Sequence, residues 1–505
     1  MVQINWFVAE CVLIAFERKP MSFSIRSIRR VLFVVPSVLV LFGTLLTPAA
    51  LLTAATRPNI VLIMADDMGY ECVSSNGGAT YSTPRIDSLA KSGIRFLNGH
   101  SQPICTPSRV QIMTGLYNNR NYIRFGFLDP KATTFGHVLK SAGYKTCIVG
   151  KWQLEGGLGA PGHFGFDEYC LWQLTRRPSR YANPGLEVNG KLLDYKNGEY
   201  GPDLVSDYLC DFIERNKDGP FFAYYPMILP HWPFEPTPDS PDYDKTFPGA
   251  KGVGQMKYFK DMVSYTDKLV GKIVDKLASL GLREKTLVIF TGDNGTYVKI
   301  VSNLNGAKYP GGKGSTRDNG THVPLVASWP GTAPAGKVSD ALVDFSDILP
   351  TLAETTGAKL PSEEVYEGVS LAPLLRGKAF KGRESIYCWY HRNGQRGKES
   401  QHSRSRDFKL YSTGRYFRVA GDLLEKKPIK IGSLAGRGLA AYKALKTALD
   451  VQLETTRKST EALKKRGFGG ATKKQGKNKN TKAKNAEKKQ TRKKAKNEKR
   501  EKKQN

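Results

Sequence analysis

The sequence has little cysteine, and its cysteines follow no pattern. Seven are scattered over 505 residues without a CxxC pair or a regular spacing, which excludes a disulfide framework and a cysteine-rich zinc site. A single disulfide stays possible, and for most of these thiols we expect small, buried side chains. The chain also lacks an internal repeat, and its length excludes a single small binding module.

Charge is absent from one long N-terminal stretch. No charged residue stands between Arg30 and Arg57, and an arginine cluster precedes an apolar run over 31–46. Small residues follow that run, so residues 1–55 are typical of a secretory signal peptide, with Met21 as the expected true start. The apolar stretch is also long enough to span a bilayer, and an uncleaved N-terminal anchor is the alternative. Either way we expect an exported protein that is periplasmic, extracellular or membrane-anchored.

Acidic residues are few relative to basic ones. Asp and Glu number 46 against 77 Lys and Arg, which gives a formal net charge of +31. Residues 464–505 alone hold 19 Lys and Arg against three Glu, and we expect this Lys-rich tail to be disordered. Because aromatic residues are absent after Phe468, the tail lacks a stacking platform, and no specific nucleic acid is predicted. Contact with anionic polymers and a merely solvating role are both open.

Beyond residue 57 the chain has the pattern of a globular α/β protein. Short apolar runs alternate with amphipathic stretches, which predicts a mixed, mostly parallel sheet between helices. The expected strands are 60–64, 145–149, 221–225, 286–290 and 324–328, and the expected helices are 84–92, 107–114, 134–142 and 255–280.

The C-terminal part has a different composition and predicts a second, smaller unit. We expect a main domain over 56–375, a small antiparallel α+β subdomain with a helix over 376–463, and the disordered tail over 464–505. Within the subdomain, short strands are expected at 385–390, 408–411 and 416–419, and a helix is expected over 434–463.

Two of the predicted strands end in acidic pairs. The first runs into Asp66 and Asp67, and the fourth runs into Asp293 and Asn294. Because ligands of open α/β sheets bind beyond the carboxyl ends of the strands, both pairs could converge on one site. Three carboxylates and an amide oxygen would suit a hard cation such as Ca²⁺ or Mg²⁺. Aspartate and asparagine after strands are also common turn formers, which is the alternative for either pair alone.

Cys105 stands at the start of a predicted helix. Thr106 is the expected N-cap and Pro107 the expected first helical residue. A helix N-terminus favours anions and depresses the pKa of a thiol, so Cys105 is a candidate nucleophile beside an anion pocket. An incidental cysteine before a capped helix is the alternative.

Several short motifs occur in a fixed order along the chain. They are Asp66-Asp67, Cys105-Thr106-Pro107-Ser108-Arg109, Gly150-Lys151-Trp152, Gly165-Phe166-Asp167, Pro230-His231, Asp293-Asn294-Gly295 and Gly312-Lys313-Gly314. The second resembles the C-x-P-S-R signature of the formylglycine-dependent sulfatases, arylsulfatase-like members of the alkaline phosphatase superfamily, and the whole ordered set is similar to that family over about residues 57 to 375.

The resemblance implies a mechanism and a metal. Cys105 would be converted to formylglycine by a formylglycine-generating or equivalent enzyme, and the hydrated aldehyde would attack the sulfur of a sulfate ester through a covalent sulfo-enzyme intermediate. One divalent cation, Ca²⁺ with Mg²⁺ or Mn²⁺ as alternatives, would contact the modified residue. The implied ligands are Asp66, Asp67, Asp293 and Asn294, together with the modified Cys105.

The resemblance also implies roles for four basic residues. Arg109 would hold the hydrated aldehyde, and Lys151 and Lys313 would bind sulfate oxygens. His231 would contact the sulfate and protonate the leaving oxygen, work that an imidazole titrating near neutrality suits. One position departs from the family pattern, because Gln153 stands where a second histidine is usual. Glutamine cannot titrate, so slow turnover, a substitute group or a shifted substrate preference are all open.

The resemblance implies a sulfuric ester hydrolase, and the substrate that we expect is a sulfated carbohydrate such as a sulfated polysaccharide. A phosphonate monoester or phosphodiester hydrolase of the same superfamily is the first alternative. A non-catalytic binder of anionic glycans is the second, motivated by Gln153 and the basic tail.

Overall fold

The computed structural model describes residues 57–247, 249 and 254–468. The predicted export segment over 1–55 and the tail beyond 468 lie outside the described residues. In the part of the chain that is described, no helix combines the length and the apolar character needed to cross a membrane. The six cysteines found there are all free thiols, so none of them forms the single disulfide left open above.

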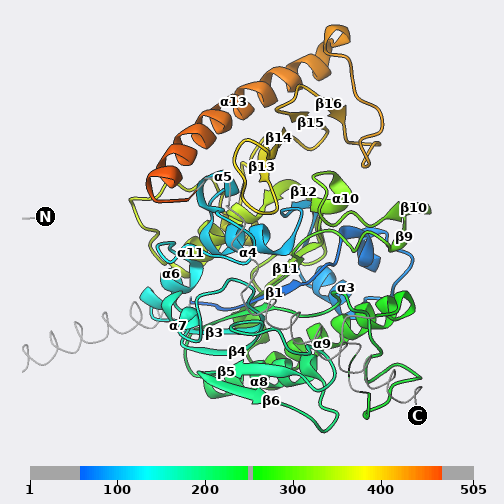
Figure 1. Ribbon diagram of the computed structural model, residues 1–505, viewed down its shortest axis with the longest axis vertical. Helices are drawn as coiled ribbons and strands as arrows, with labels where there is room; N and C mark the ends of the chain where they lie inside the picture. The colour runs from blue at the N-terminus through cyan, green and yellow to red at the C-terminus, as the bar shows by residue number, and fades with distance from the viewer. Residues whose placement is uncertain (1–56, 248, 250–253, 469–505) are drawn as a thin grey trace, which may run out of the picture. The chain divides into compact units, whose positions relative to one another are not determined.

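A ten-stranded mixed sheet forms the centre of the protein, in the order β12-β2-β11-β8-β1-β7-β3-β4-β5-β6 (Figure 1). The five successive strands β8, β1, β7, β3 and β4 run parallel, and β12 is parallel to β2. The strands are β1 (Asn59–Ala65), β2 (Ile94–His100), β3 (Lys145–Lys151), β4 (Glu168–Trp172), β5 (Gly185–Val188), β6 (Lys191–Asp194), β7 (Phe221–Pro226), β8 (Thr286–Gly292), β11 (Leu325–Ser328) and β12 (Lys337–Asp344). The expected fold class is confirmed.

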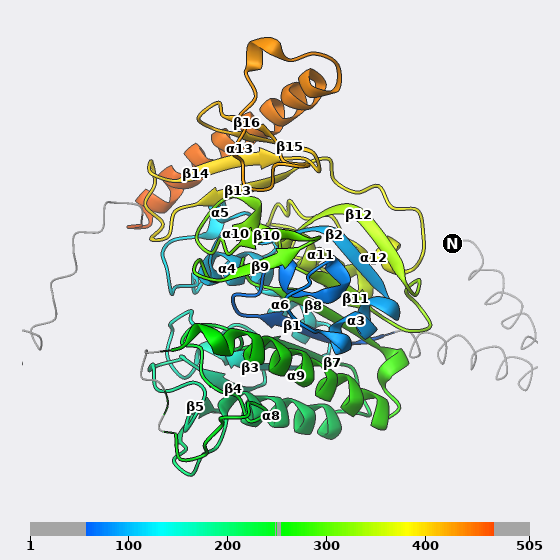
Figure 2. The ribbon, with the colours of Figure 1, turned by 90° about the vertical axis from the view of Figure 1, so that its right-hand side faces the viewer.

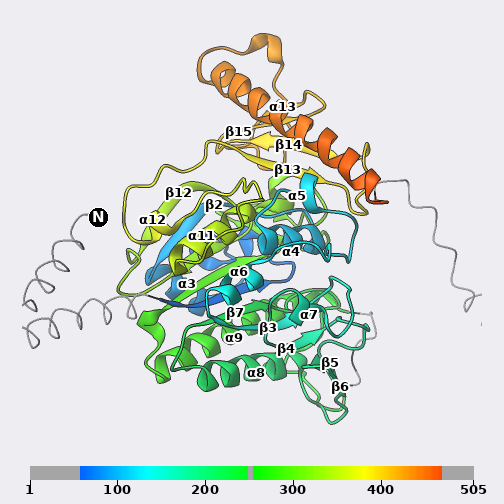
Figure 3. The same cartoon turned by 90° about the vertical axis from the view of Figure 1, so that its left-hand side faces the viewer.

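Helices cover both faces of this sheet because its central strands are apolar on both sides. Val61 and Ile63 of β1 pack with α3 (Pro84–Lys91), α8 (Gly201–Arg215) and α9 (Phe259–Ser279). Ile60 and Leu62 face the opposite layer, which is made of α4 (Cys105–Thr114), α6 (Phe135–Ser141) and α11 (Ile348–Thr356). Figure 3 shows α8 and α9 side by side below the strands. The alternation along one strand thus divides the core into two layers.

Shorter elements connect these layers. They are α5 (Asn118–Asn121), α7 (Ala160–His163), α10 (Asp318–Thr321), α12 (Ala372–Leu375) and a two-stranded hairpin of β9 (Val301–Leu304) and β10 (Ala307–Pro310).

The five predicted strands all occur, but five further strands of the large sheet were not predicted. β2 and β12 carry polar residues such as Arg95, Asn98 and Asp340 within their spans, so their sequences do not read as apolar runs. β5 and β6 have four residues each at the edge of the sheet, where one side of a strand stays in water. The remaining strand, β4, is largely apolar and buried, with the sequence EYCLW, and was missed although it has the pattern by which the other central strands were predicted.

A four-stranded antiparallel sheet, β13-β14-β15-β16, follows at the C-terminal end of the described chain. Its strands are β13 (Ile386–Tyr390), β14 (Ser400–Arg404), β15 (Phe408–Tyr411) and β16 (Tyr416–Arg418). The long helix α13 (Gly436–Lys465) lies across this sheet (Figure 2). Strand β14 was not predicted, since its sequence, SQHSR, has no apolar residue.

Candidate active site

The two acidic pairs meet because the strands that carry them are neighbours. β1 and β8 pair in parallel, with Ala65 opposite Gly292, so the residues that follow each strand emerge side by side. The backbone N–H of Asp67 donates to Oδ1 of Asp293 at 3.0 Å, and Nδ2 of Asn294 donates to Oδ1 of Asp67 at 2.9 Å. Asp66, Asp67, Asp293 and Asn294 are all fully buried.

Three cations neutralise the three buried carboxylates. Nζ of Lys151, at the end of β3, lies 2.9 and 2.8 Å from the two carboxylate oxygens of Asp66. Nη2 of Arg109 donates to Oδ2 of Asp293 at 3.1 Å, and Nζ of Lys313 lies 2.6 Å from Oδ2 of Asp67. Burial on its own would raise the pKa of Asp66, but the ammonium of Lys151 and the other nearby cations hold it well below its usual range. Asp293 differs, because burial and the charge of Asp66 raise its pKa to about 7 although Arg109 and Lys151 oppose them.

Cys105 opens helix α4 and points into this cluster. Its sulfur, one carboxylate oxygen each of Asp66 and Asp67, and a ring nitrogen of His231 all lie within 4.8 Å of one another. The expected depression of the thiol pKa is wrong: burial raises the pKa of Cys105, and the charges of Lys151 and Lys313 offset this only in part. Desolvation of the thiolate outweighs the helix terminus.

The start of α4 also differs from the prediction. The N-cap is Ile104 rather than Thr106, and no side chain caps the helix. The hydroxyl of Ser108 instead lies 3.1 Å from the carbonyl oxygens of both Gln102 and Ile104 and closes the preceding loop. Oγ1 of Thr106 accepts from the backbone N–H of Gly126 at 3.2 Å. The helix therefore begins one residue before Thr106 and places Cys105 inside its first turn.

His231 lies beyond β7, against the same carboxylates. Its Nε2 is 3.6 Å from Oδ2 of Asp67, and its Nδ1 contacts the carbonyl of Trp232. Burial and the charge of Lys313 lower the pKa of His231 well below its ordinary value, so the expectation of an imidazole titrating near neutrality is wrong for the free protein. The hydroxyl of Tyr181 donates to the carbonyl of His231 and fixes this turn.

The residues at the ends of β1 and β8 fit a hard cation. Carboxylates of Asp66, Asp67 and Asp293 supply oxygen donors, as Ca²⁺ and Mg²⁺ prefer. Oδ1 of Asn294 is buried and has no hydrogen-bond partner among the described residues, which is unusual for a buried amide oxygen. A cation beside these carboxylates would satisfy that oxygen.

Gln153 sits just beyond Lys151 in a left-handed backbone conformation, with φ of 58°. Its backbone N–H donates to the carbonyl of Gln173 at 3.2 Å, and its side-chain oxygen has no hydrogen-bond partner in the described part of the chain. His163, the nearest histidine along the sequence, has its Nε2 2.7 Å from the carbonyl of Pro130, and it forms no hydrogen bond or ion pair with the cluster in the described residues.

Two further candidate functional residues, Arg180 and Arg177, were not predicted from the sequence. Arg180 is buried, lies with its guanidinium 3.9 Å over the ring of Trp172, and places Nη1 3.9 Å from Oδ2 of Asp66. Arg177, three residues earlier, is exposed. The available signal was the arginine-rich segment Arg176-Arg177-Pro178-Ser179-Arg180, directly after β4.

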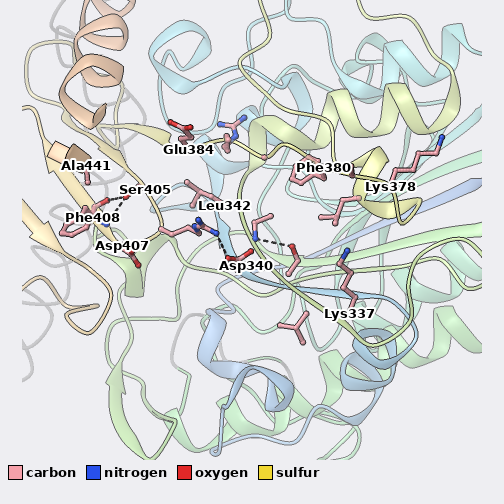
Figure 4. Close-up of a pocket in the computed structure, with 18 of the residues that line it drawn as sticks. Lys337, Asp340, Leu342, Lys378, Phe380, Glu384, Ser405, Asp407, Phe408 and Ala441 are labelled. Carbon is pink, nitrogen blue, oxygen red and sulfur yellow. Dashed lines mark hydrogen bonds and ion pairs between the residues drawn. The ribbon is translucent and has the colours of Figure 1, made fainter. Parts of the chain in front are cut away.

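A separate cavity lies away from this site. It measures about 750 Å³ and is bounded by β12, the segment after α12, and α13 (Figure 4). Two ion pairs lie in its lining, Arg406 with Asp340 and Arg437 with Asp407. The group of candidate metal ligands found in the described residues lies at the strand ends and not in this cavity.

The chain resembles known proteins over most of its length. The family model described as Sulfatase matches residues 58–358, and the model described as N-sulphoglucosamine sulphohydrolase, C-terminal, matches 313–458. Arylsulfatase A of Bos taurus is 33% identical over 378 residues, covering 68% of this chain and 72% of the relative. N-acetylgalactosamine-6-sulfatase of Canis lupus familiaris is 31% identical over 371 residues, covering 66% and 69%. The crystal structure of Ps i-CgsB aligns with a TM-score of 0.65 at 28% identity and covers 79% of this chain and 92% of that one.

Proposed function

The chain belongs to the sulfatase family, and we propose that it hydrolyses sulfate esters of carbohydrates with a nucleophile made from Cys105. One observation carries the proposal. The sulfur of Cys105 lies within 4.8 Å of carboxylate oxygens of Asp66 and Asp67 and of the ring of His231. Cations and carboxylates that the chain separates by up to 246 residues surround it. Buried cations beside the nucleophile would attract the negative charge of a sulfate ester.

Cys105 would act after conversion to formylglycine by a modifying enzyme of the host. The modification would supply a hydrated aldehyde whose oxygen attacks sulfur while the bond from sulfur to the organic oxygen breaks. The raised pKa of the unmodified thiol supports this, because a buried neutral thiol is a poor nucleophile.

The basic residues around Cys105 have distinct tasks. Lys151 and Lys313 would bind sulfate oxygens as point charges, where negative charge develops during the attack. Arg109 would orient the modified residue, since its guanidinium spans the Lys151 carbonyl at 3.0 Å and the Asp293 carboxylate at 3.1 Å. His231 has a lowered pKa in the free protein, so it would donate a proton to the leaving oxygen only after the anionic sulfate has raised that pKa.

A divalent cation, Ca²⁺ in the first instance, would be held by Asp66, Asp67, Asp293 and Asn294. When bound it would polarise a sulfate oxygen and offset its charge. The unpaired Oδ1 of Asn294 supports this assignment.

The organic part of the substrate is proposed to be a saccharide. Ps i-CgsB, at 28% identity, has been solved in complex with k-i-k-neocarrahexaose, and one relative is an N-acetylgalactosamine-6-sulfatase. The phosphonate monoester hydrolase of Agrobacterium radiobacter aligns with a TM-score of 0.59 at 20% identity, a likeness of fold alone. The hydrolysis of phosphonates or phosphodiesters is therefore not favoured, and neither is a purely binding role.

Several further parts of the proposal concern the chain outside the site. We propose export directed by residues 1–55, a catalytic domain over 56–375, a C-terminal subdomain over 376–463, and contact of the basic tail over 464–505 with anionic polymers. The net charge of the tail supports the last point.

The test is peptide mass spectrometry across Cys105 on protein from its native host, together with sulfate release from sulfated saccharides measured by ion chromatography. We expect an aldehyde in place of the thiol and no release by Cys105→Ala. An unmodified thiol in protein that still releases sulfate would refute the nucleophile. A preference for phosphodiesters over sulfate esters would refute the activity.

A further inference from the structure

A pocket of about 390 Å³ lies beside the proposed active site. Its lining comes from three places: the loop after α5, the end of β3 and the arginine-rich segment after β4. The lining residues are Phe125, Gly126, Gln153, Glu155, Gln173, Leu174, Thr175, Arg176 and Arg177.

The walls of this pocket are continuous with the catalytic elements. Gly126 donates its backbone N–H to Oγ1 of Thr106, the residue after Cys105, at 3.2 Å. Gln153 follows Lys151 by two positions, and its backbone N–H is bonded to the carbonyl of Gln173 at 3.2 Å. A molecule in the pocket would therefore lie against the residues that flank both the nucleophile and a sulfate-binding lysine.

Two unpaired amide oxygens belong to the pocket lining. Oε1 of Gln153 and Oε1 of Gln173 are both buried and have no hydrogen-bond partner within the described chain. Gln153 as a whole is only 7% exposed. Buried polar atoms of this kind are rare unless a ligand or water completes them. Hydroxyl groups of a saccharide are donors of the right kind for both oxygens.

One cation in the pocket lining, Arg177, has no ion-pair partner in the described residues. Glu155 is bonded to Nη2 of Arg124 at 2.8 Å, and Nη1 of Arg176 is bonded to Asp194 at 2.8 Å. Arg177 has neither a hydrogen bond nor an ion pair in the described residues. Burial and the charge of the neighbouring Arg180 lower the pKa of Arg177, and the carboxylate of Asp66 opposes them only in part.

We propose that this pocket binds the saccharide part of the substrate and that Arg177 pairs with a second anionic group on it, either a carboxylate or another sulfate. Gln153 and Gln173 accept hydrogen bonds from hydroxyls of the same sugar. The assignment rests on the proposed sulfatase reaction at Cys105. It gives Gln153 a task in substrate selection at a position where the family usually has a histidine, and it makes dianionic saccharides the preferred substrate class.

The first test compares three disaccharides: one with two sulfates, one with a sulfate and a uronic acid carboxylate, and one with a single sulfate and no other charge. The readout is kcat/KM for sulfate release. Arg177→Ala should lower kcat/KM for one or both dianionic sugars about tenfold more than for the monoanionic sugar. The dianionic sugar that suffers the larger loss identifies the second group.

Lys191→Ala is the matched control, because it removes one positive charge from an exposed position on β6. It should leave the ratio between the sugars as in the parent. Equal losses for all three sugars in Arg177→Ala, or no loss for any, would overturn the proposal.

The second test separates this inference from the reaction itself. Binding of the disulfated and uronate disaccharides to Cys105→Ala is measured by calorimetry, with and without Arg177→Ala. About tenfold weaker binding in the double variant supports the pocket even if the parent releases no sulfate, in which case only the proposed function fails. Unchanged binding of both sugars refutes the pocket even if the parent is an active sulfatase.

Discussion

The ammonium of Lys151 lies between the two carboxylate oxygens of Asp66, at 2.9 and 2.8 Å, and neither side chain has more than 1% of its surface exposed. A buried carboxylate is costly without a partner, and a buried ammonium equally so. The ammonium of Lys151 therefore keeps the carboxylate of Asp66 charged where β3 and β1 end. The same pair connects the implied metal site with the implied sulfate site.

Lys151→Ala is expected to harm both stability and activity. Removing one partner of a buried pair should lower the free energy of unfolding by about 3 kcal/mol, and the loss of a sulfate-binding charge should lower kcat at least about a hundredfold. Urea unfolding and turnover of an aryl sulfate measure the two effects. Lys145→Ala, an exposed change at the other end of β3, serves as control and should alter neither. Near-parental turnover by Lys151→Ala would contradict the assigned role.

Arg109→Lys tests whether the guanidinium is needed for its shape as well as its charge. Arg109 donates through Nη1 to the Lys151 carbonyl and through Nη2 to Asp293, at 3.0 and 3.1 Å. An ammonium cannot span both acceptors in one plane, so we expect kcat to fall at least about tenfold while the net charge stays the same. Activity equal to that of the parent would indicate that only the charge of Arg109 matters.

Ca²⁺ added to protein treated with a chelator should raise the melting temperature by at least about 2 °C, because a ligand that binds only the folded state stabilises it. Asn294→Ala should lose most of this response, since Oδ1 of Asn294 is the unpaired buried oxygen among the proposed ligands. Asn98→Ala removes an amide that bonds the Asp340 carbonyl on the far strands and should respond as the parent does. Thermal denaturation by circular dichroism is sufficient, and an unaltered response in Asn294→Ala would argue against this ligand.

The convergence of the acidic pairs could be predicted from sequence because it depends only on strand order. Two apolar runs, each followed by acidic residues, become neighbours whenever their strands pair in parallel, as β1 and β8 do. The positions of Arg180 beside Asp66 and of Arg177 in the neighbouring pocket could not be predicted in this way. Their positions depend on the path of the chain after β4, and no periodic pattern determines the path of an irregular segment.

The pKa values of the site residues were harder to predict from the sequence than the identity of those residues. The sequence places Cys105 at a helix N-terminus, which lowers a thiol pKa, but it does not give the depth of burial, which here raises it. The prediction that His231 titrates near neutrality was wrong for the same reason, because burial lowers its pKa. Desolvation is a property of the whole packed site, whereas a motif reports only the neighbours along the chain.

Helix α13 is held to the rest of the protein by a buried polar cluster around Thr456. Its Oγ1 lies 3.1 Å from the hydroxyl of Tyr387, 3.1 Å from Oε1 of Gln401 and 3.2 Å from Nδ2 of Asn119. Thr456→Val leaves these buried groups short of a partner and should cost about 1–3 kcal/mol of stability.

Thr455→Val is the matched control for this change. The neighbouring threonine is half-buried, and its hydroxyl bonds only the Val451 carbonyl of its own helix, so we expect a change within about 0.5 kcal/mol. Chemical unfolding measures both variants. Equal stabilities would indicate that α13 contributes little to the cooperative unit.

Stability should fall in mild acid because a buried histidine has to stay neutral. His322 stacks on Tyr70 with ring centroids 3.9 Å apart, donates from Nε2 to the Leu97 carbonyl at 2.9 Å, and has no partner at Nδ1 in the described residues. Burial lowers the pKa of His322 from its ordinary 6.5 to about 4. The charge of Asp318 opposes this shift, and the charge of Arg404 adds to it.

The direction of the pH dependence of stability follows from this lowered pKa. A depressed pKa in the folded state stabilises the protein above pH 6.5, and the contribution is lost as the pH falls toward 4, where the unfolded chain binds the additional proton. We expect His322→Gln to be less stable than the parent at pH 7 but to lose less melting temperature between pH 7 and pH 4.5, by several degrees. Thermal denaturation of both proteins across this range measures the difference. Parallel curves would mean that other buried groups, such as His100 and His402, govern the acid response.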